Sequence, residues 1–110
     1  MAVDPAAAVA WYTRAAGLGN VLGMHNLGNA YRSGTGAVRD PEMAAHWYRR
    51  AAERGDALTA FWLGQMYERG EGVPQDAEAA LRWYRAGTER GNRQAIEAVG
   101  RLEHGLLGFR

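Results

Sequence analysis

The chain has 110 residues, with thirteen basic residues, all of them arginine, against twelve acidic ones, and no cysteine. This composition excludes disulfides and thiolate zinc sites, and the near-neutral charge argues against general nucleic-acid binding. The apolar runs are short and rich in alanine, so neither a membrane span nor a secretory signal is predicted. We therefore expect a cytoplasmic setting, unless the chain is a fragment of a longer protein.

The most informative feature of the sequence is an internal repeat of 36 residues. A tryptophan followed by a tyrosine recurs at that interval, at Trp11, Trp47 and Trp83. The same period links further residues: Asp4, Asp40 and Asp76; Ala8, Ala44 and Ala80; Gly19, Gly55 and Gly91; and Gly28, Gly64 and Gly100. Chance does not produce so many matches at one interval, so the chain is predicted to be built from repeated structural units.

One helix of each unit carries the Trp-Tyr pair. These helices are predicted at roughly 5–17, 41–54 and 77–90. An aspartate and a proline open the first two of them, which supplies an N-cap acceptor and a residue suited to the first helical position. In the first copy, Ala8, Trp11, Tyr12 and Ala15 share one apolar face. We therefore expect the Trp-Tyr pairs to pack in the core.

The other helix of each unit follows a glycine and a capping residue. It is predicted at about 21–33, 57–69 and 93–104. Gly28 and Gly64 lie mid-helix, where glycine costs about 1 kcal/mol relative to alanine, so each indicates close contact with a neighbouring helix. No segment alternates with the period of a strand. The predicted fold class is all-α: an α-solenoid of about six antiparallel helices.

Residues 57–92 contain the most complete set of repeated motifs. They are Leu63-Gly64, Met66-Tyr67, Gly70-Glu71-Gly72-Val73-Pro74, Asp76, Ala80, Trp83-Tyr84 and Gly91. With these residues the segment resembles the Sel-one-like repeat (SLR) family, whose members are relatives of the tetratricopeptide repeat. Residues 21–56 match nearly as well, while residues 5–20 look like a half-repeat and residues 93–110 like a degenerate one. We therefore expect a single SLR domain over residues 1–110, coiled as a right-handed superhelical stack.

The resemblance implies different roles for the two kinds of helix. In the SLR family the helix with the Leu-Gly pair lines a concave groove, and the Trp-Tyr helix lies outside. Family members act as scaffolds and adaptors in protein complexes, often in bacterial signalling and envelope processes. Many carry a cysteine pair in each repeat, and its absence from this chain favours a reducing compartment. Arginine at every basic position, with abundant alanine and glycine, indicates a GC-rich genome and favours a bacterial source.

A stripe of residues on the Leu-Gly helices is predicted to face this groove. On the second such helix, Leu58, Phe61, Gln65 and Glu68 follow one face that is rotated away from the core face. The full set of predicted partner-binding residues is Leu22, His25, Asn29, Arg32, Leu58, Phe61, Trp62, Gln65, Glu68, Gln94, Glu97 and Arg101. An apolar centre with a polar surround is typical of binding surfaces. The alternative for Phe61 and Trp62 is packing against the next repeat.

No catalytic residue, metal site or cofactor is predicted. Ser33 is the one serine, its place beside Gly34 is explained by helix capping, and the chain has no lysine or cysteine to act as a nucleophile. The histidines His25, His46 and His104 occupy three different positions of the repeat and lack the spacing of one helical turn. The Gly-x-Gly loops follow helices, whereas a phosphate-binding loop follows a strand.

These patterns predict a non-catalytic module that binds a peptide or protein segment in the groove of a scaffold or adaptor. The expected partner is another protein or peptide, with no nucleic acid and no membrane span. Two alternatives remain. The chain is a structural fragment or cap of a longer SLR array, or it is a hydrolase or small-ligand-binding protein that uses the groove.

Overall fold

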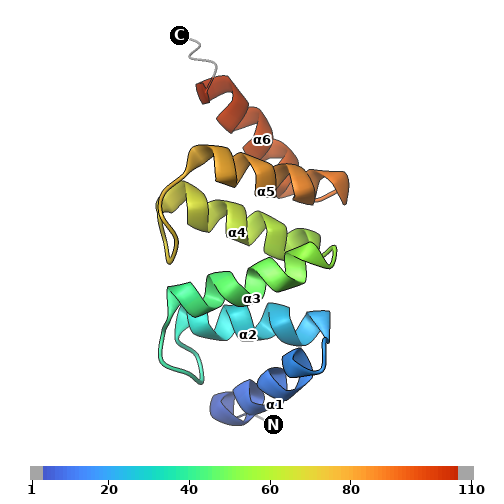
Figure 1. Cartoon of the computed structure of the whole chain (residues 1–110), viewed down its shortest axis with the longest axis vertical. Helices are drawn as coiled ribbons and strands as arrows, with labels where there is room; N and C mark the ends of the chain where they lie inside the picture. Colours follow the sequence, from blue (N-terminus) through green and yellow to red (C-terminus); the bar gives the residue numbers. More distant parts are fainter. Residues whose placement is uncertain (1–3, 107–110) are drawn as a thin grey trace.

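The chain folds into six α-helices that stack along one axis, with consecutive helices running in opposite directions (Figure 1). The computed structural model describes residues 4–106. The helices are α1 (Pro5–Gly17), α2 (Val21–Ser33), α3 (Pro41–Glu53), α4 (Ala57–Arg69), α5 (Ala77–Glu89) and α6 (Arg93–Leu106). No strand occurs within the described residues, so the predicted all-α solenoid is confirmed. Residues 1–3 and 107–110 of the expected domain lie outside them.

Polar side chains fix the beginning of each of the six helices. Asn20 accepts a hydrogen bond from the Gly23 amide at 2.8 Å, and Asp40 accepts one from the Met43 amide at 3.2 Å. At the end of α2, Gly34 adopts a φ of 77°, a left-handed conformation that glycine reaches without steric cost. These capping residues explain why the sequence predicts the helix ends to within two residues.

The mid-helix glycines of α2 and α4 each receive a tyrosine ring from the following helix. A Cβ atom added at Gly28 would lie 2.5 Å from the Tyr48 ring, and one added at Gly64 would lie 2.5 Å from the Tyr84 ring. Both tyrosines are 1% exposed. The expected close contact is therefore confirmed, and the group that makes it is an aromatic ring.

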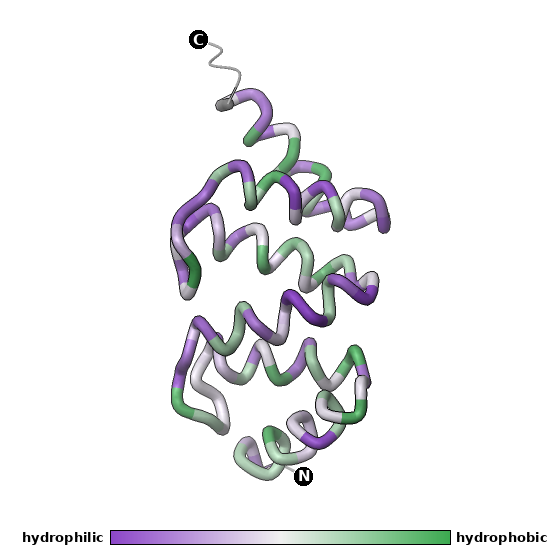
Figure 2. The backbone as a smooth tube through the Cα atoms, viewed as in Figure 1, coloured by the Kyte–Doolittle hydropathy of each residue, from purple (hydrophilic) through white to green (hydrophobic). Residues whose placement is uncertain are grey.

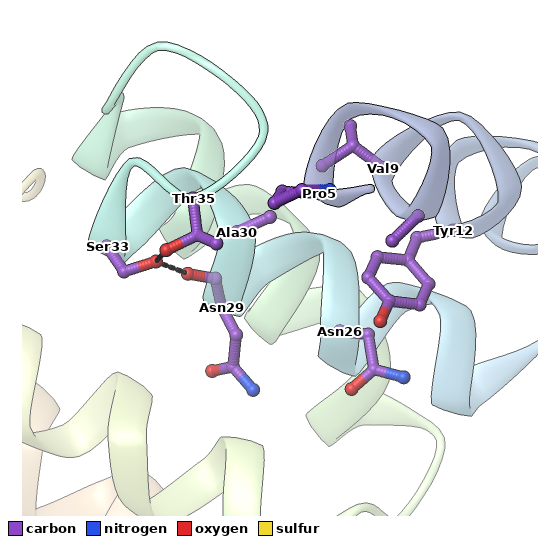
Figure 3. Close-up of a pocket in the computed structure, with 9 residues that line it drawn as sticks. Pro5, Val9, Tyr12, Asn26, Asn29, Ala30, Ser33 and Thr35 are labelled. Atoms are coloured by element: carbon purple, nitrogen blue, oxygen red, sulfur yellow. Dashed lines mark hydrogen bonds between the residues drawn. The ribbon is translucent and has the colours of Figure 1, made fainter. Parts of the chain in front are cut away.

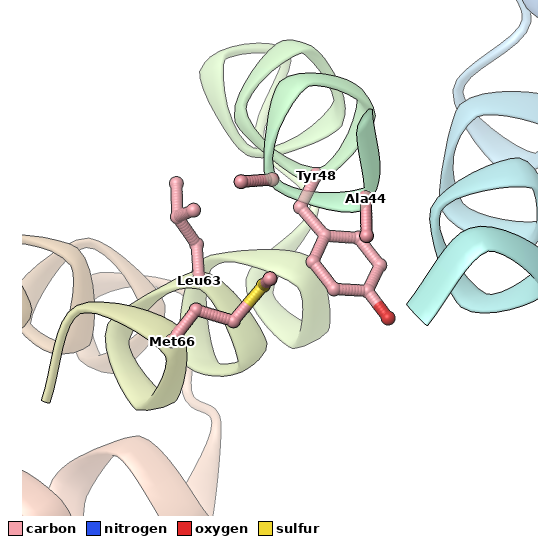
Figure 4. Packing of buried hydrophobic residues seen from close by; sticks show 5 residues of the cluster. Ala44, Tyr48, Leu63 and Met66 are labelled. Carbon is pink, nitrogen blue, oxygen red and sulfur yellow. The ribbon is translucent and has the colours of Figure 1, made fainter. Parts of the chain in front are cut away.

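The core consists of clusters between neighbouring helices. Figure 4 shows one of them, where Leu63 and Met66 extend from α4 toward Ala44 and Tyr48 of α3. Its members Ala44, Leu63 and Met66 are fully buried. Apolar and polar residues interleave along the helices in Figure 2, as expected for helices that bury one face. Each helix is thus held mainly by its neighbours in the stack.

The tryptophans of the Trp-Tyr pairs are less buried than expected. Trp47 and Trp83 are partly buried and pack against clusters formed with the preceding helices. Trp11 is 66% exposed, because no helix precedes α1 within the described residues. The expectation of core packing is therefore wrong for Trp11 and holds best for the tyrosines.

Candidate binding groove

Two adjoining hollows lie along one side of α2, α4 and α6. The larger, of about 850 Å³, is lined by Phe61, Gln65, Glu68, Arg69, Gln75, Tyr84, Gln94, Glu97, Ala98 and Arg101. The smaller, of about 580 Å³, is lined by Asn29, Arg32, Ser33, Tyr48, Trp62, Gln65, Arg69 and Glu71. Because Gln65 and Arg69 line both, we treat the two hollows as one groove, called the groove below.

Most of the predicted partner-binding residues line the groove. They are Asn29, Arg32, Phe61, Trp62, Gln65, Glu68, Gln94, Glu97 and Arg101. Three others line neither hollow. Leu22 is 64% exposed in the first turn of α2, while Leu58 is partly buried against the cluster that contains Phe61. The third, His25, is hydrogen-bonded to the side chain of Asp56.

Phe61 forms a buried floor rather than a projecting anchor. It is 8% exposed and packs with Ala80, Ala95 and Ala98. Its ring centroid lies 5.6 Å from that of Tyr84. Of the two alternatives for Phe61, packing against the next repeat describes this side chain better, because α5 and α6 cover most of it.

Trp62 is held by rings from two neighbouring helices. Its ring centroid lies 5.4 Å from that of Tyr48 and 4.7 Å from that of His25, which meets it edge-on. His25 Nδ1 in turn lies 2.8 Å from Asp56 Oδ2, and Asp56 caps the start of α4 through the Leu58 amide. These contacts tie α2 to α4, so His25 has a structural role within the stack.

Arginine–glutamate pairs line the groove and connect successive repeats. Arg32 of α2 binds Glu71, in the loop between α4 and α5, through two hydrogen bonds of 3.0 Å, and Arg101 of α6 binds Glu68 of α4. The hydrogen bond from Arg32 lowers the pKa of the Glu71 carboxyl, and the bond from Arg101 lowers that of Glu68. Both carboxyl groups are therefore ionised and neutralised by a partner at neutral pH.

The tyrosines of α3 and α5 complete this polar lining. The Tyr84 hydroxyl donates to Glu68 Oε1 at 2.7 Å, and the Tyr48 hydroxyl donates to Asn29 Oδ1. Burial raises the pKa of Tyr48 to about 12, and burial also raises the pKa of Tyr84. Both phenols are therefore neutral hydrogen-bond donors at physiological pH.

Helical spacing does not predict the other residues that line the groove, which are Ser33, Tyr48, Arg69, Glu71, Gln75, Tyr84 and Ala98. Glu71 lies in a Gly-x-Gly loop that was interpreted as structural, and Tyr84 belongs to a pair that was assigned to the core. Arg69 lies one position beyond the predicted stripe of α4. No local pattern marks Glu71 as the partner of Arg32, because the two residues lie 39 positions apart and the residue one period beyond Arg32 is Glu68.

A smaller hollow of about 200 Å³ lies between α1 and α2 (Figure 3). Tyr12 and Asn26 lie at one end of it, and Ser33 and Thr35 lie at the other. The Ser33 hydroxyl lies 2.9 Å from the Asn29 carbonyl oxygen and 2.8 Å from the Thr35 hydroxyl. These contacts match the capping role that the sequence predicts for Ser33.

The described residues contain no group of three or more histidine, aspartate or glutamate side chains that could hold a metal ion. The histidines His25, His46 and His104 are distributed over α2, α3 and α6. His46 meets the Trp47 ring edge-on at 4.9 Å. None of the helices in the described part of the chain is long and apolar enough to cross a membrane.

The repeat sequence and the stacked helix pairs agree with one family. The sequence model of the Sel1 repeat matches residues 1–20, 21–56 and 57–92. The chain belongs to the Sel1 repeat family. The predicted SLR resemblance is thereby confirmed, while the assignment of residues 93–110 as a degenerate half-repeat stays a prediction. A search of curated proteins found no match.

Solved structures of Sel1 repeat proteins have the same fold. The chain is 35% identical to c5321, a protective antigen of uropathogenic Escherichia coli strains, with a TM-score of 0.87 over 91% of this chain and 21% of that one. It is 32% identical to a Sel1 repeat protein from Oxalobacter formigenes, with a TM-score of 0.86 over 93% of this chain and 42% of that one. Cysteine rich protein B of Helicobacter pylori, 24% identical, shares the fold with a TM-score of 0.77 over 81% of this chain and 67% of that one.

These Sel1 repeat relatives extend well beyond the length of this chain. The chain spans about a fifth of the E. coli antigen and about two fifths of the O. formigenes protein. Sel1 repeats are generally protein–protein interaction modules, and the proteins that contain them are typically non-enzymatic scaffolds.

Proposed function

We propose that the groove binds an extended segment of a partner protein, without catalysis. The observation that carries this proposal is the continuity of the two hollows across Gln65 and Arg69. A groove that crosses α2, α4 and α6 suits a chain laid across the repeats better than a compact small molecule.

The free hydrogen-bonding groups of the groove support an extended backbone as the ligand. The side chains of Gln65, Arg69, Gln94 and Glu97 make no hydrogen bond or ion pair within residues 4–106, although the Arg69 charge helps to lower the pKa of Glu68 and Glu71. Two of them are amides, which donate and accept at once, as the amide groups of an extended peptide do. Such side chains fix the register of a bound segment without requiring a particular partner sequence.

The charges of the groove support a partner of mixed polarity. Glu68 and Glu71 are already paired with arginines, so most of the local charge is neutralised within the protein. Arg69 and Glu97 remain as opposite charges that line the larger hollow. We therefore expect binding through hydrogen bonds and shape, with a weak dependence on salt.

The test starts from peptides selected on the chain from a random display library. Their affinity is then measured by calorimetry for the wild type and for a Gln65→Ala, Arg69→Ala double variant. We expect the double variant to lose at least about tenfold in affinity, because both side chains line both hollows. Peptides that bind the double variant as tightly as the wild type would place binding outside the groove.

Two controls keep this test specific. Arg82→Ala removes an exposed arginine on α5 that makes no hydrogen bond or ion pair within the described residues, and it should leave the affinity unchanged. Melting curves should coincide for all three proteins, because neither Gln65 nor Arg69 contributes to a buried cluster. Phe61→Ala is unsuitable as a binding test, since a loss of a buried ring destabilises the fold.

A further inference from the structure

The smaller hollow of the groove has more positive than negative charge. Arg32, Arg69 and Glu71 line it. At its edge, the Arg39 guanidinium lies 3.5 Å from the Glu71 carboxylate. The hydrogen bond from Arg32 lowers the pKa of Glu71, and the nearby charges of Arg39 and Arg69 lower it further. Three guanidinium groups therefore act on one carboxylate, which leaves an excess of positive charge in this hollow.

The charges of the larger hollow are balanced instead. Two acidic and two basic residues line it: Glu68, Glu97, Arg69 and Arg101. Hydrogen bonds from Arg101 are the main cause of the lowered pKa of Glu68, and the charge of Arg69 adds little. The excess of positive charge is therefore confined to the smaller hollow, between α2 and α4.

The structural contact that Arg39 makes does not require its charge. Arg39 Nε donates to the Arg32 carbonyl oxygen at 3.0 Å. One repeat later, Gln75 Nε2 donates to the Glu68 carbonyl oxygen at 2.9 Å. A neutral amide thus makes the same backbone contact at the equivalent position. A guanidinium has five N–H donors, so Arg39, whose side chain is 57% exposed, retains donors for a ligand.

Arg69 supplies the second available guanidinium. It is exposed in the last turn of α4, and its side chain makes no hydrogen bond or ion pair with the part of the chain that the structure describes. It lines both hollows, so a segment that crosses the groove passes this side chain. Arg69 can therefore bind an anionic group without breaking a contact within the protein.

Two aromatic rings line the smaller hollow together with these charges. Tyr48 is 1% exposed, and its ring centroid lies 5.4 Å from that of Trp62. Apolar ring surface excludes water and lowers the local dielectric constant, which strengthens a charge-assisted hydrogen bond beside it. The hollow thus combines guanidinium donors with a surface that favours ion pairing.

We propose that the smaller hollow selects an acidic side chain, aspartate or glutamate, at one position of the segment that crosses the groove. This inference rests on the proposed function and adds the chemical class of one residue of the partner. Gln65 binds the backbone of the segment whatever its sequence, whereas Arg39 and Arg69 bind the carboxylate through the planar fork of a guanidinium. The carboxylate belongs to a side chain and not to the end of the partner, because the groove continues past Arg69 into the larger hollow.

The first experiment compares peptides selected from a random display library on two proteins. One is the wild type and the other is the Arg39→Gln, Arg69→Gln double variant. On the wild type, we expect aspartate and glutamate to be enriched at least about threefold at one peptide position, as one exposed ion pair allows. This enrichment should disappear on the double variant. A wild-type pool without an acidic preference would overturn the proposal.

The second experiment measures the ion pair by a double-mutant cycle. A selected peptide is synthesised with both ends blocked, and a second peptide has its acidic residue replaced by the corresponding amide. On the wild type, this replacement should weaken binding about fivefold in calorimetry. On the double variant it should weaken binding less than about twofold, because the charges that pair with the carboxylate are absent. An equal loss on both proteins, or binding that requires a free carboxyl terminus, would overturn the proposal.

The controls separate this proposal from the proposed function. Gln65→Ala changes no charge, so it should weaken both peptides equally if the segment lies in the groove. If Gln65→Ala weakens neither peptide, the proposed function fails and this inference fails with it. If it weakens both, but the acidic residue contributes equally on the wild type and the double variant, only this inference fails.

Two further measurements exclude indirect effects. Arg82→Gln removes an exposed charge on α5 and should leave the fivefold preference for the acidic peptide intact. Melting curves of the double variant and the wild type should nearly coincide, because glutamine at position 39 can keep the backbone contact as Gln75 does. A loss of the preference in Arg82→Gln would show that net charge, and not the hollow, selects the peptide.

Discussion

The contact between a mid-helix glycine and a tyrosine is the smallest unit from which this stack is built. Gly28 and Gly64 have no side chain, so the rings of Tyr48 and Tyr84 approach the helix backbone directly. The loss in helix propensity is offset by the burial of a large aromatic surface, since an aromatic side chain buries about 150–250 Å². The repeat therefore needs glycine and tyrosine together, one on each of two successive helices.

The first prediction concerns the sign of a glycine substitution. Gly64→Ala should lower the free energy of unfolding by about 1–3 kcal/mol, because the new Cβ would lie 2.5 Å from the Tyr84 ring. Gly100→Ala at the equivalent position of α6 should instead raise it by up to about 1 kcal/mol, because nothing lies within 4 Å. Urea unfolding of both variants at low protein concentration measures the two effects. Equal changes would show that helix propensity alone governs these positions.

For Phe61, the sequence predicts the helix face on which the side chain lies but not how deeply the side chain is buried. Helical spacing places it correctly on the stripe that includes Gln65 and Glu68, and both neighbours line the groove. The spacing does not reveal that Tyr84 and Ala95 of later helices cover the ring. One helix face supplies both the floor of the groove and the core beneath it, and the depth of a side chain depends on elements far along the chain.

At the scale of the helices, ion pairs across the repeats complement the apolar contacts. Arg32 of α2 reaches Glu71, which lies in the loop between α4 and α5, and Arg39 lies 3.5 Å from the same carboxylate. The side chains of Arg32 and Glu71 are 18% and 19% exposed, so solvent screens this pair only in part. The pair therefore links one repeat to the loop of the next.

The second prediction concerns this pair and pH. The pKa of Glu71 is lowered in the folded chain, so the folded state binds fewer protons than the unfolded state in the acid range. The stabilisation is therefore complete above the unfolded pKa of about 4.3 and is lost as the pH falls through the folded pKa. Glu71→Gln should lower the free energy of unfolding by about 1–2 kcal/mol at neutral pH, and the difference from the wild type should shrink below about pH 4.

Unfolding by urea at several pH values measures this difference. Glu89→Gln is the control, because Glu89 is exposed at the end of α5 and forms no ion pair within the described residues. Its stability should follow that of the wild type at every pH. A constant difference between Glu71→Gln and the wild type over the whole range would show that the charge of Glu71 is not what stabilises the fold.

Local sequence signals predict the helices, but they do not predict the contacts between repeats. Capping residues and the 36-residue period act over short distances, so α2 and α4 begin and end where the sequence predicts. The Arg32–Glu71 pair joins residues 39 positions apart, and nothing in the local pattern marks it. Most residues of the predicted stripe line the two hollows, but helical spacing does not show which of them are already paired.

At the scale of the whole molecule, the stack is held by a series of neighbour contacts. Every extensive helix–helix contact joins helices that follow one another in the chain, from α1·α2 to α5·α6. The free energy of unfolding of such a stack is approximately the sum of the intrinsic stabilities of its repeats and the interaction free energies between neighbouring repeats. α1 and α6 each have one neighbour among the described helices, while the four helices between them have two.

The last prediction follows from this arrangement of neighbours. We expect amide hydrogen exchange to be slowest in α3 and α4 and at least about tenfold faster in α1 and α6, because the end helices can open without disrupting the central contacts. Circular dichroism should still show a helical spectrum with one main cooperative melt, since six helices with short loops unfold as a coupled series. Equal protection of all six helices would contradict the neighbour-sum description, because it would require the ends to be coupled to the centre as strongly as the central helices are to one another.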